Sequence, residues 1–412
     1  MPRAKSSAPD APIAYTHLTP RHIAGLLKHQ YSAADNSLVD SVFQHWWNFV
    51  VEFVPLSVAP NLITVSGLVV YSAMIAPLCY EGAALTGAGG ALQWWMFACF
   101  SAGLFIYQTL DAIDGKQARR TGTSTPLGEL FDHGCDAIAC NHVCLSTVTA
   151  MGWTWAEHTY VIVAMFFCTH MAFFRSHWRA YFTHTMEFGK LDVTEGQLFL
   201  MGVHAYTAYL YHAGDGGARW AAALRPGQAV ALGYDWSEPR MLVFAFICLT
   251  TTSIYALTAV ELLQTQGAGK ALPLLVPGFS ILATTLGVMR LAGTETTGQH
   301  GFAFVSAMGL LLTMNNCKIV VAHMTAKEVC PETQFKLLLP ELLPLVGLGL
   351  FYLSGSAQDA AQSLLAARVA AGATLLIFAH YFIGMINDIC NGLPSNGAFL
   401  RGECFRIKHA KE

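Results

Sequence analysis

Acidic and imidazole side chains interrupt an otherwise apolar part of the chain between residues 110 and 136. Asp111 and Asp114 are three positions apart, and Asp132 and Asp136 are four apart. A helix presents side chains at these spacings on one face. Two adjacent antiparallel helices would therefore bring four carboxylates to one point.

Such a group of carboxylates needs a counter-charge. A single carboxylate at the centre of a membrane helix costs about 2.5–3.5 kcal/mol on insertion scales, and four at one depth also repel one another. Ion pairs with Lys116, Arg119 and Arg120 are one solution. Two divalent cations are the other, and oxygen ligands favour Mg²⁺ or Mn²⁺ over zinc. Two metal ions held by shared aspartates suit phosphoryl transfer.

Three side chains in the same stretch are candidates for a general base. His133 has the ordinary pKa suited to proton transfer near neutral pH, but it could instead orient an aspartate. Glu129 lies one turn earlier on nearly the same face, and the third candidate, Asp136, is implied by the resemblance to a known family that is given below. The spacing does not choose among them.

Small and polar residues around the aspartates also fit a phosphate site. Gly115 leaves room for a bulky group close to the backbone, and Gly128 and Gly134 allow two helices to approach. Arg119 can bind a phosphate through two hydrogen bonds. Asn61 follows Pro60 at the expected start of a helix, where Asn is a good cap.

The elements that position these residues are expected to be membrane helices. The 412 residues are 54% apolar and 12% charged, about half the charged fraction of an average soluble protein. The formal net charge of −3 gives no basic field for nucleic acid. The composition predicts an all-α polytopic membrane protein.

Ten segments are apolar over about the length that a membrane helix needs. They span residues 61–80, 91–113, 130–152, 158–174, 196–213, 240–263, 271–291, 301–323, 337–354 and 366–388. Residues 44–57 are too short to span easily and suit a helix lying in the membrane interface. Residues 15–42 are expected to form an amphipathic cytosolic lead-in with a helix start at Leu18-Thr19-Pro20. The glycine-rich stretch 82–90 and residues 214–239 are expected to be loops on the far side.

The distribution of Lys and Arg fits ten spans with both termini in the cytosol. This arrangement leaves only five of the 23 Lys and Arg residues on the far side, namely Arg219, Arg225, Arg240, Arg290 and Arg368. The other 18 would face the cytosol. Counting residues 44–57 as another span would invert the remaining loops and destroy this bias.

The charged stretch also fills every fixed position of the pattern D-x2-D-G-x2-A-R-x8-G-x3-D-x3-D. These positions are Asp111, Asp114, Gly115, Ala118, Arg119, Gly128, Asp132 and Asp136. The pattern resembles the signature of the CDP-alcohol phosphotransferases. The resemblance implies that the four aspartates bind two Mg²⁺ ions, which Mn²⁺ can replace, and that these ions hold the diphosphate of a CDP-alcohol. It also implies nucleotide contacts from Asn61, Gly115, Ala118, Arg119 and Gly128, with CMP as the leaving group.

Further stretches resemble the eukaryotic choline/ethanolamine branch of this family. They are HQYSAADNSLVD at 29–40, PNLIT at 60–64, FGKLDVTE at 188–195 and AHMT at 322–325. The resemblance implies transfer of phosphocholine, and in some members phosphoethanolamine, from CDP-choline or CDP-ethanolamine supplied by the cytosol to diacylglycerol in the bilayer. It places the enzyme in the endoplasmic reticulum, with the Golgi as the alternative, and allows a homodimer. An ethanolamine-specific enzyme or another CDP-alcohol phosphatidyltransferase remains an alternative.

The expected organisation has four parts. They are a cytosolic and interfacial segment (1–57), catalytic core helices (58–213), additional transmembrane helices (214–390) and a cytosolic tail (391–412). A transporter would also carry polar residues in its helices, but a second acidic constellation in a matching half is not present in the sequence. His170, His177, His184, His204 and His212 form no H-E-x-x-H motif and are interpreted as core or interfacial residues.

Overall fold

The computed structural model describes residues 17–34, 37–81, 92–187, 189, 192–224, 226–227, 229–293, 297–325, 339–355, 359–393 and 405. The expected glycine-rich loop at 82–90 lies outside the described residues, as do most of the tail 391–412 and three positions of the 188–195 stretch.

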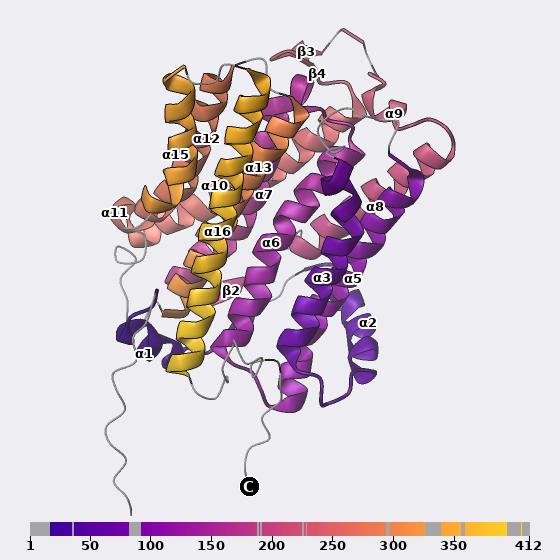
Figure 1. Cartoon of the computed structure of the whole chain (residues 1–412). Helices are drawn as coiled ribbons and strands as arrows, with labels where there is room; N and C mark the ends of the chain where they lie inside the picture. Colours follow the sequence, from indigo (N-terminus) through magenta and orange to yellow (C-terminus); the bar gives the residue numbers. More distant parts are fainter. Residues whose placement is uncertain are drawn as a thin grey trace, which may run out of the picture.

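Long helices make up nearly all of the described structure (Figure 1). The long and medium helices are α1 (Pro20–Lys28), α2 (Asp40–Glu52), α3 (Pro60–Glu81), α5 (Trp94–Thr121), α6 (Pro126–Ala150), α7 (Trp155–Thr183), α8 (Val193–His212), α10 (Pro239–Gln266), α12 (Val276–Ala292), α13 (Gly298–Thr325), α15 (Leu339–Leu353) and α16 (Ala360–Gly392). The short elements are α9 (Ala218–Ala221), α11 (Ala268–Ala271), the 3₁₀ helix η1 (Leu272–Leu275) and the two-residue strands β1 (Ala33–Ala34), β2 (Met186–Glu187), β3 (Val230–Ala231) and β4 (Tyr234–Asp235). Strands β1 and β2 pair in parallel, whereas β3 and β4 form an antiparallel pair.

Local sequence signals set many of the helix ends. The predicted start at Thr19-Pro20 is confirmed, because the Thr19 hydroxyl accepts a hydrogen bond from the His22 amide and Pro20 occupies the first turn. Thr125 and Pro126 begin α6 in the same way. Helix α5 ends at Gly122, whose positive φ of 65° suits a residue without a side chain. These two signals place a short connection between α5 and α6.

The predicted all-α polytopic membrane fold is confirmed. Each of the ten predicted segments coincides with a helix or, for 271–291, with the continuous run α11–η1–α12. Seven of the described helices are long and apolar enough to cross a membrane: α3, α5, α7, α10, α11–α12, α13 and α16. Of the other three, α6 and α8 carry more polar side chains and α15 has only 15 residues.

Helix α13 is the central element of the bundle. Its side chains are buried almost throughout, and it packs against α6, α7, α12 and α16. On the other side of α6, helices α3, α5 and α8 pack together. The helix α6 therefore lies between α13 and the group of α3, α5 and α8, so a site on α6 is enclosed from several directions.

The N-terminal segment contacts the helix bundle at several points. The carboxylate of Asp388 on α16 accepts hydrogen bonds from the backbone amides of His17 and Leu18 at 2.6 and 2.9 Å. Further on, Ser37 donates to Glu195 of α8 at 2.6 Å, and Lys116 of α5 donates to α2. The lead-in predicted to be amphipathic thus packs against the helices through one face.

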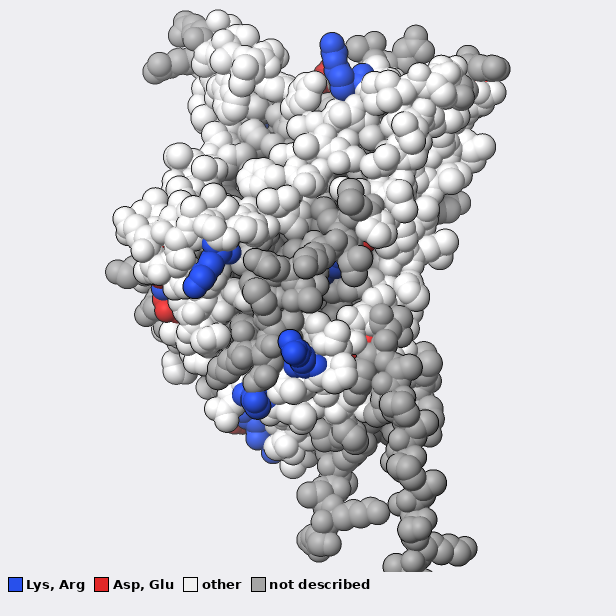
Figure 2. All heavy atoms as spheres, turned by 90° about the vertical axis from the view of Figure 1, so that its left-hand side faces the viewer, with Lys and Arg blue, Asp and Glu red and all other residues white. Residues whose placement is uncertain are grey.

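The two ends of the bundle differ. Helices α1 and α2 lie at one end, and α9 with the β3–β4 pair lies at the opposite end (Figure 1). Residues 214–239, predicted as a loop, contain these short elements. On the face shown in Figure 2, the described residues between the cations near the top and those at mid-height and below are almost all uncharged. Such a zone suits a protein surface in contact with lipid.

Candidate active site

The structure brings the four predicted aspartates together at the end of the bundle that carries α1 and α2. Ligand atoms of Asp111, Asp114 and Asp132 lie within 4.8 Å of one another. Ligand atoms of Asp132, His133 and Asp136 form a second group within the same distance. Asp132 belongs to both groups. The facing arrangement arises because α5 and α6 are consecutive helices joined by the short turn after Gly122.

Neighbouring hydroxyl groups orient two of these carboxylates. The Thr64 hydroxyl of α3 donates to Asp114, and the Tyr107 hydroxyl of α5 donates to Asp136 at 2.9 Å. By contrast, Asp111 Oδ1 is buried and has no hydrogen-bond partner among the residues that the structure describes. A buried carboxylate oxygen with no donor is costly, and a bound cation would satisfy it.

The nearby cations point elsewhere. Lys116 donates to the side chains of Gln44 and Asn48 on α2 at 2.6 and 2.8 Å. Arg120 donates to the backbone carbonyl groups at Val51 and Val54. Among the described residues, no Lys or Arg forms an ion pair with any of the four aspartates. The interpretation as structural ion pairs is therefore not supported, and the donor set fits hard divalent ions.

His133 lies beside this cluster. Its side chain is buried, its Nδ1 atom lies 3.9 Å from Asp136 Oδ2, and no described residue forms a hydrogen bond with its Nε2 atom. The ring also contacts His177, with the two centroids 4.6 Å apart. An imidazole held near a carboxylate through one nitrogen and free at the other is suited to accept a proton.

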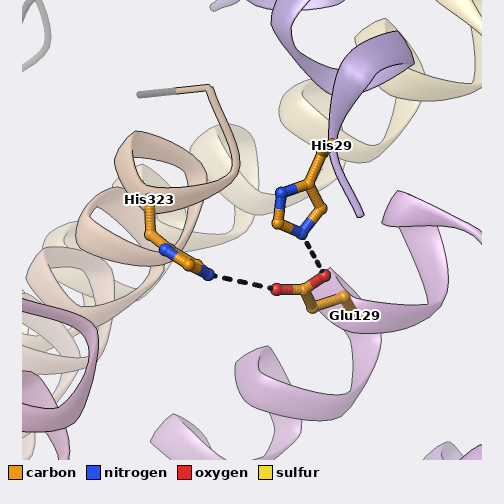
Figure 3. A group of neighbouring side chains, drawn as sticks. All are labelled: His29, Glu129 and His323. Carbon is orange, nitrogen blue, oxygen red and sulfur yellow. Dashed lines mark hydrogen bonds and ion pairs between the residues drawn. The ribbon is translucent and has the colours of Figure 1, made fainter. Parts of the chain in front are cut away.

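Glu129, the competing base, faces a different set of side chains. Its Oε2 atom lies 2.6 Å from His29 Nε2, and its Oε1 atom lies 3.7 Å from His323 Nε2 (Figure 3). Its carboxylate is grouped with these two imidazoles and not with the aspartates. The structure therefore gives Glu129 and His133 different partners, although they lie one turn apart on α6.

The residues expected to contact a nucleotide lie on α5 and α6, the helices that carry the aspartates, and in the first turn of α3. A Cβ atom at Gly115 would meet the Arg119 guanidinium at 3.6 Å, and one at Gly128 would meet Asn61 Oδ1 at 3.6 Å. Arg119 is exposed and Ala118 is half-buried. Helix α3 begins at Pro60, so Asn61 lies inside its first turn instead of preceding the helix as a cap. Gly134 packs closely against the Phe382 ring of α16.

Several residues of the site were not predicted as such from the sequence. Tyr107 lies on α5 itself, whereas Thr64 comes from α3, His323 from α13 and His29 from the N-terminal segment. Tyr31 is another, with its ring centroid 6.3 Å from that of His133. Partial burial, and then the negative charges of Asp132 and Glu129, raise the pKa of the Tyr31 phenol. The stretches HQYSAADNSLVD and AHMT contain His29, Tyr31 and His323, so their resemblance to the family was the available signal.

The fold and this site define a class of protein. Residues 57–224 match the CDP-alcohol phosphatidyltransferase family, and relatives more than 30% identical cover most of the chain. The chain belongs to this family and is a membrane transferase that acts on phosphate groups.

Similar proteins carry a more specific name. Cholinephosphotransferase 1 of Xenopus laevis is 33% identical over 337 residues, which are 76% of this chain and 75% of the relative. The protein of the same name from Danio rerio is 34% identical over 74% of this chain and 77% of its own. The Homo sapiens protein of this name is 32% identical over 76% of this chain and 74% of its own.

Proposed function

We propose that this protein transfers phosphocholine from CDP-choline to diacylglycerol, which yields phosphatidylcholine and CMP. The observation that carries the proposal is the convergence of four aspartates at one end of a membrane-helix bundle, without a Lys or Arg partner in the part of the chain that the structure describes. The names of the relatives support choline as the head group. This location suits a water-soluble donor that arrives at the membrane surface and a lipid acceptor that stays in the bilayer.

In this proposal Asp111, Asp114, Asp132 and Asp136 hold two Mg²⁺ ions, which Mn²⁺ can replace. When bound, such ions supply positive charge to the diphosphate and to the departing phosphate oxygen. All four ligands are oxygen atoms, and Asp111 Oδ1 has no other partner among the described residues. The donor chemistry therefore fits the ions.

The chain's own residues then bind the donor and move one proton. Asn61, Gly115, Ala118, Arg119 and Gly128 form the rim that receives the nucleotide. The Nε2 atom of His133 accepts the proton of the diacylglycerol hydroxyl as its oxygen attacks the phosphocholine phosphorus. The bond from that phosphorus to the bridging oxygen breaks, and the electron pair leaves with CMP. Asp136 orients the His133 ring through Nδ1. Glu129 is the competing base.

We further propose ten spans, with the end that carries α1 and α2, and both chain termini, in the cytosol. The coincidence of the ten apolar segments with helices and the bias of Lys and Arg support this arrangement. The organisation into residues 1–57, 58–213, 214–390 and 391–412 follows from it. The endoplasmic reticulum is the proposed membrane, with the Golgi as the alternative. A homodimer is compatible with the proposal.

The decisive experiment measures CMP release by the purified protein with CDP-choline, diacylglycerol and Mg²⁺. Wild-type protein should release CMP, and D132N should not, because it loses a ligand shared by both groups. H133A should lower kcat by about 10²–10⁴-fold, the usual contribution of a general base, with an unchanged Mg²⁺ concentration for half activity.

E129Q is the matched comparison for H133A. If Glu129 were the base, E129Q would lose more kcat than H133A. Full turnover by both variants would leave Asp136 as the base. CDP-ethanolamine in place of CDP-choline measures head-group preference, and faster turnover with it would contradict the assignment to choline.

A further inference from the structure

Three side chains of the types that bind metal ions meet outside the aspartate cluster. His29 follows α1, Glu129 lies in the first turn of α6, and His323 lies near the end of α13 (Figure 3). Their ligand atoms lie within 4.8 Å of one another. The exposed fractions of the three side chains are 10%, 7% and 2%, respectively. The proposed phosphotransfer assigns no role to either histidine.

The geometry is close to that of a tetrahedral metal centre. With metal–ligand bonds of about 2.0–2.1 Å, two ligand atoms lie about 3.3 Å apart and two imidazole centroids about 5 Å apart. The two nitrogen-to-carboxylate distances here are 2.6 and 3.7 Å, which lie on either side of the first value. The centroids of His29 and His323 are 5.4 Å apart. Small side-chain movements would suffice to admit an ion.

Two independent observations concern the surroundings of these side chains. A cavity of about 30 Å³ is lined by His29, Gln30, His184, His323 and Met324, which is room enough for a water molecule as a further ligand. His177 is only 1% exposed, and within the described structure both of its ring nitrogens lack a hydrogen-bond partner. Its centroid lies 6.1 Å from that of His323. His177 therefore lies between His323 and His133, whose centroid is 4.6 Å away, and a buried imidazole without a partner at this place calls for a water molecule or an ion nearby.

The donor types determine which ion fits. Two imidazole nitrogens and one carboxylate suit Zn²⁺ and other borderline transition-metal ions, whereas Mg²⁺ and Ca²⁺ prefer oxygen ligands alone. We propose that His29, Glu129 and His323 form a binding site for one transition-metal ion of the zinc class, separate from the aspartate cluster. The ion joins the N-terminal segment to α6 and α13 beside the candidate active site.

Cobalt provides a test that does not depend on catalysis. Tag-free protein in detergent, with Mg²⁺ in excess to saturate the aspartates, is titrated with Co²⁺ while the visible absorption of tetrahedral cobalt is recorded. Wild-type protein should develop the band up to one Co²⁺ per chain, and Zn²⁺ should abolish it by displacement. No band, or a band that Zn²⁺ does not displace, would overturn the proposal.

Variants locate the site. H29Q and H323Q should each lose the band, and Gln at position 29 can still hydrogen-bond to Glu129, so this variant should remain folded. H45Q removes an exposed histidine on α2, and D111N alters the aspartate cluster; both should keep the band. Zn²⁺ should raise the thermal unfolding midpoint of the wild type but not of H29Q. A band retained in both H29Q and H323Q, or lost in D111N, would refute the assignment. Neither result bears on phosphocholine transfer, which is measured separately by CMP release.

Discussion

The replacement of Asp111 by Asn separates the requirement for metal binding from the requirement for folding. Asp111 shares its group with Asp114 and Asp132, and its Oδ1 atom has no hydrogen-bond partner in the described structure. In the metal-free protein this carboxylate has nearby negative charges and no Lys or Arg partner among the described residues. The variant D111N should therefore be inactive in phosphotransfer and yet at least as stable as the wild type when metal is absent.

The spacing of the carboxylates gives the size of this effect. Two ionised groups no more than 4.8 Å apart repel by at least about 3 kcal/mol at an effective dielectric constant of about 20. The neutral amide of the D111N variant would have no such repulsion with Asp114 or Asp132. Metal binding has the opposite effect on the wild type, because an ion at 100 times its dissociation constant stabilises the folded state by about 2.7 kcal/mol. D111N should gain much less from Mg²⁺.

Both effects are measured by thermal unfolding in detergent, in which size-exclusion chromatography with fluorescence detection gives the fraction of folded protein left at each temperature. With EDTA, the midpoint of D111N should equal or exceed that of the wild type. With Mg²⁺, the wild-type midpoint should rise and overtake that of D111N. The matched control is D388N, which alters a buried carboxylate that accepts two backbone hydrogen bonds and should lower the midpoint under both conditions. A midpoint for D111N well below the wild type in EDTA, or an equal Mg²⁺ shift in both, would refute the reasoning.

Three other outcomes follow from the same structure. T64V removes the hydroxyl that donates to Asp114, and a hydrogen bond to a charged group contributes about 1.5–3 kcal/mol. Activity should therefore fall about 10- to 100-fold, or the Mg²⁺ requirement should rise. Activity curves in a Mg²⁺ titration that match those of the wild type would contradict the contact. G309A should destabilise the packing of α13 on α6 by about 1–3 kcal/mol, because a Cβ atom there would lie 1.9 Å from Asn141 Oδ1; an unaltered thermal midpoint would argue against this packing. Leu232 is 87% exposed at the end of the bundle opposite α1. On a cysteine-free background, L232C should therefore react with a membrane-impermeant maleimide only after sealed microsomes are opened. Labelling in intact microsomes would reverse the proposed topology.

The amino-acid sequence alone determined the features that depend on local spacing. The pairs Asp111–Asp114 and Asp132–Asp136 share a face because a helix has a fixed repeat, whatever surrounds it. The starts of α1 and α6 follow from Thr and Pro at consecutive positions. The Thr hydroxyl accepts a hydrogen bond from a free backbone amide of the first turn, and Pro has no amide hydrogen that would need a partner. The apolar segments also predicted the helices, because backbone groups in lipid must be hydrogen-bonded within the segment.

The tertiary structure decided which partners these residues meet. The donor to Asp114 is a threonine 50 positions away, and the carboxylate of Glu129 pairs with a histidine 100 positions away. Sequence spacing could not show that Lys116 binds α2 and leaves the aspartates without an ion pair, since a flexible cation can reach several acceptors. Likewise, Glu129 and His133 share a helix face, but only the packing of α1 and α13 against α6 directs Glu129 to His29 and His323. Long-range contacts arise from the packing of whole helix faces, and no local pattern of residues specifies them.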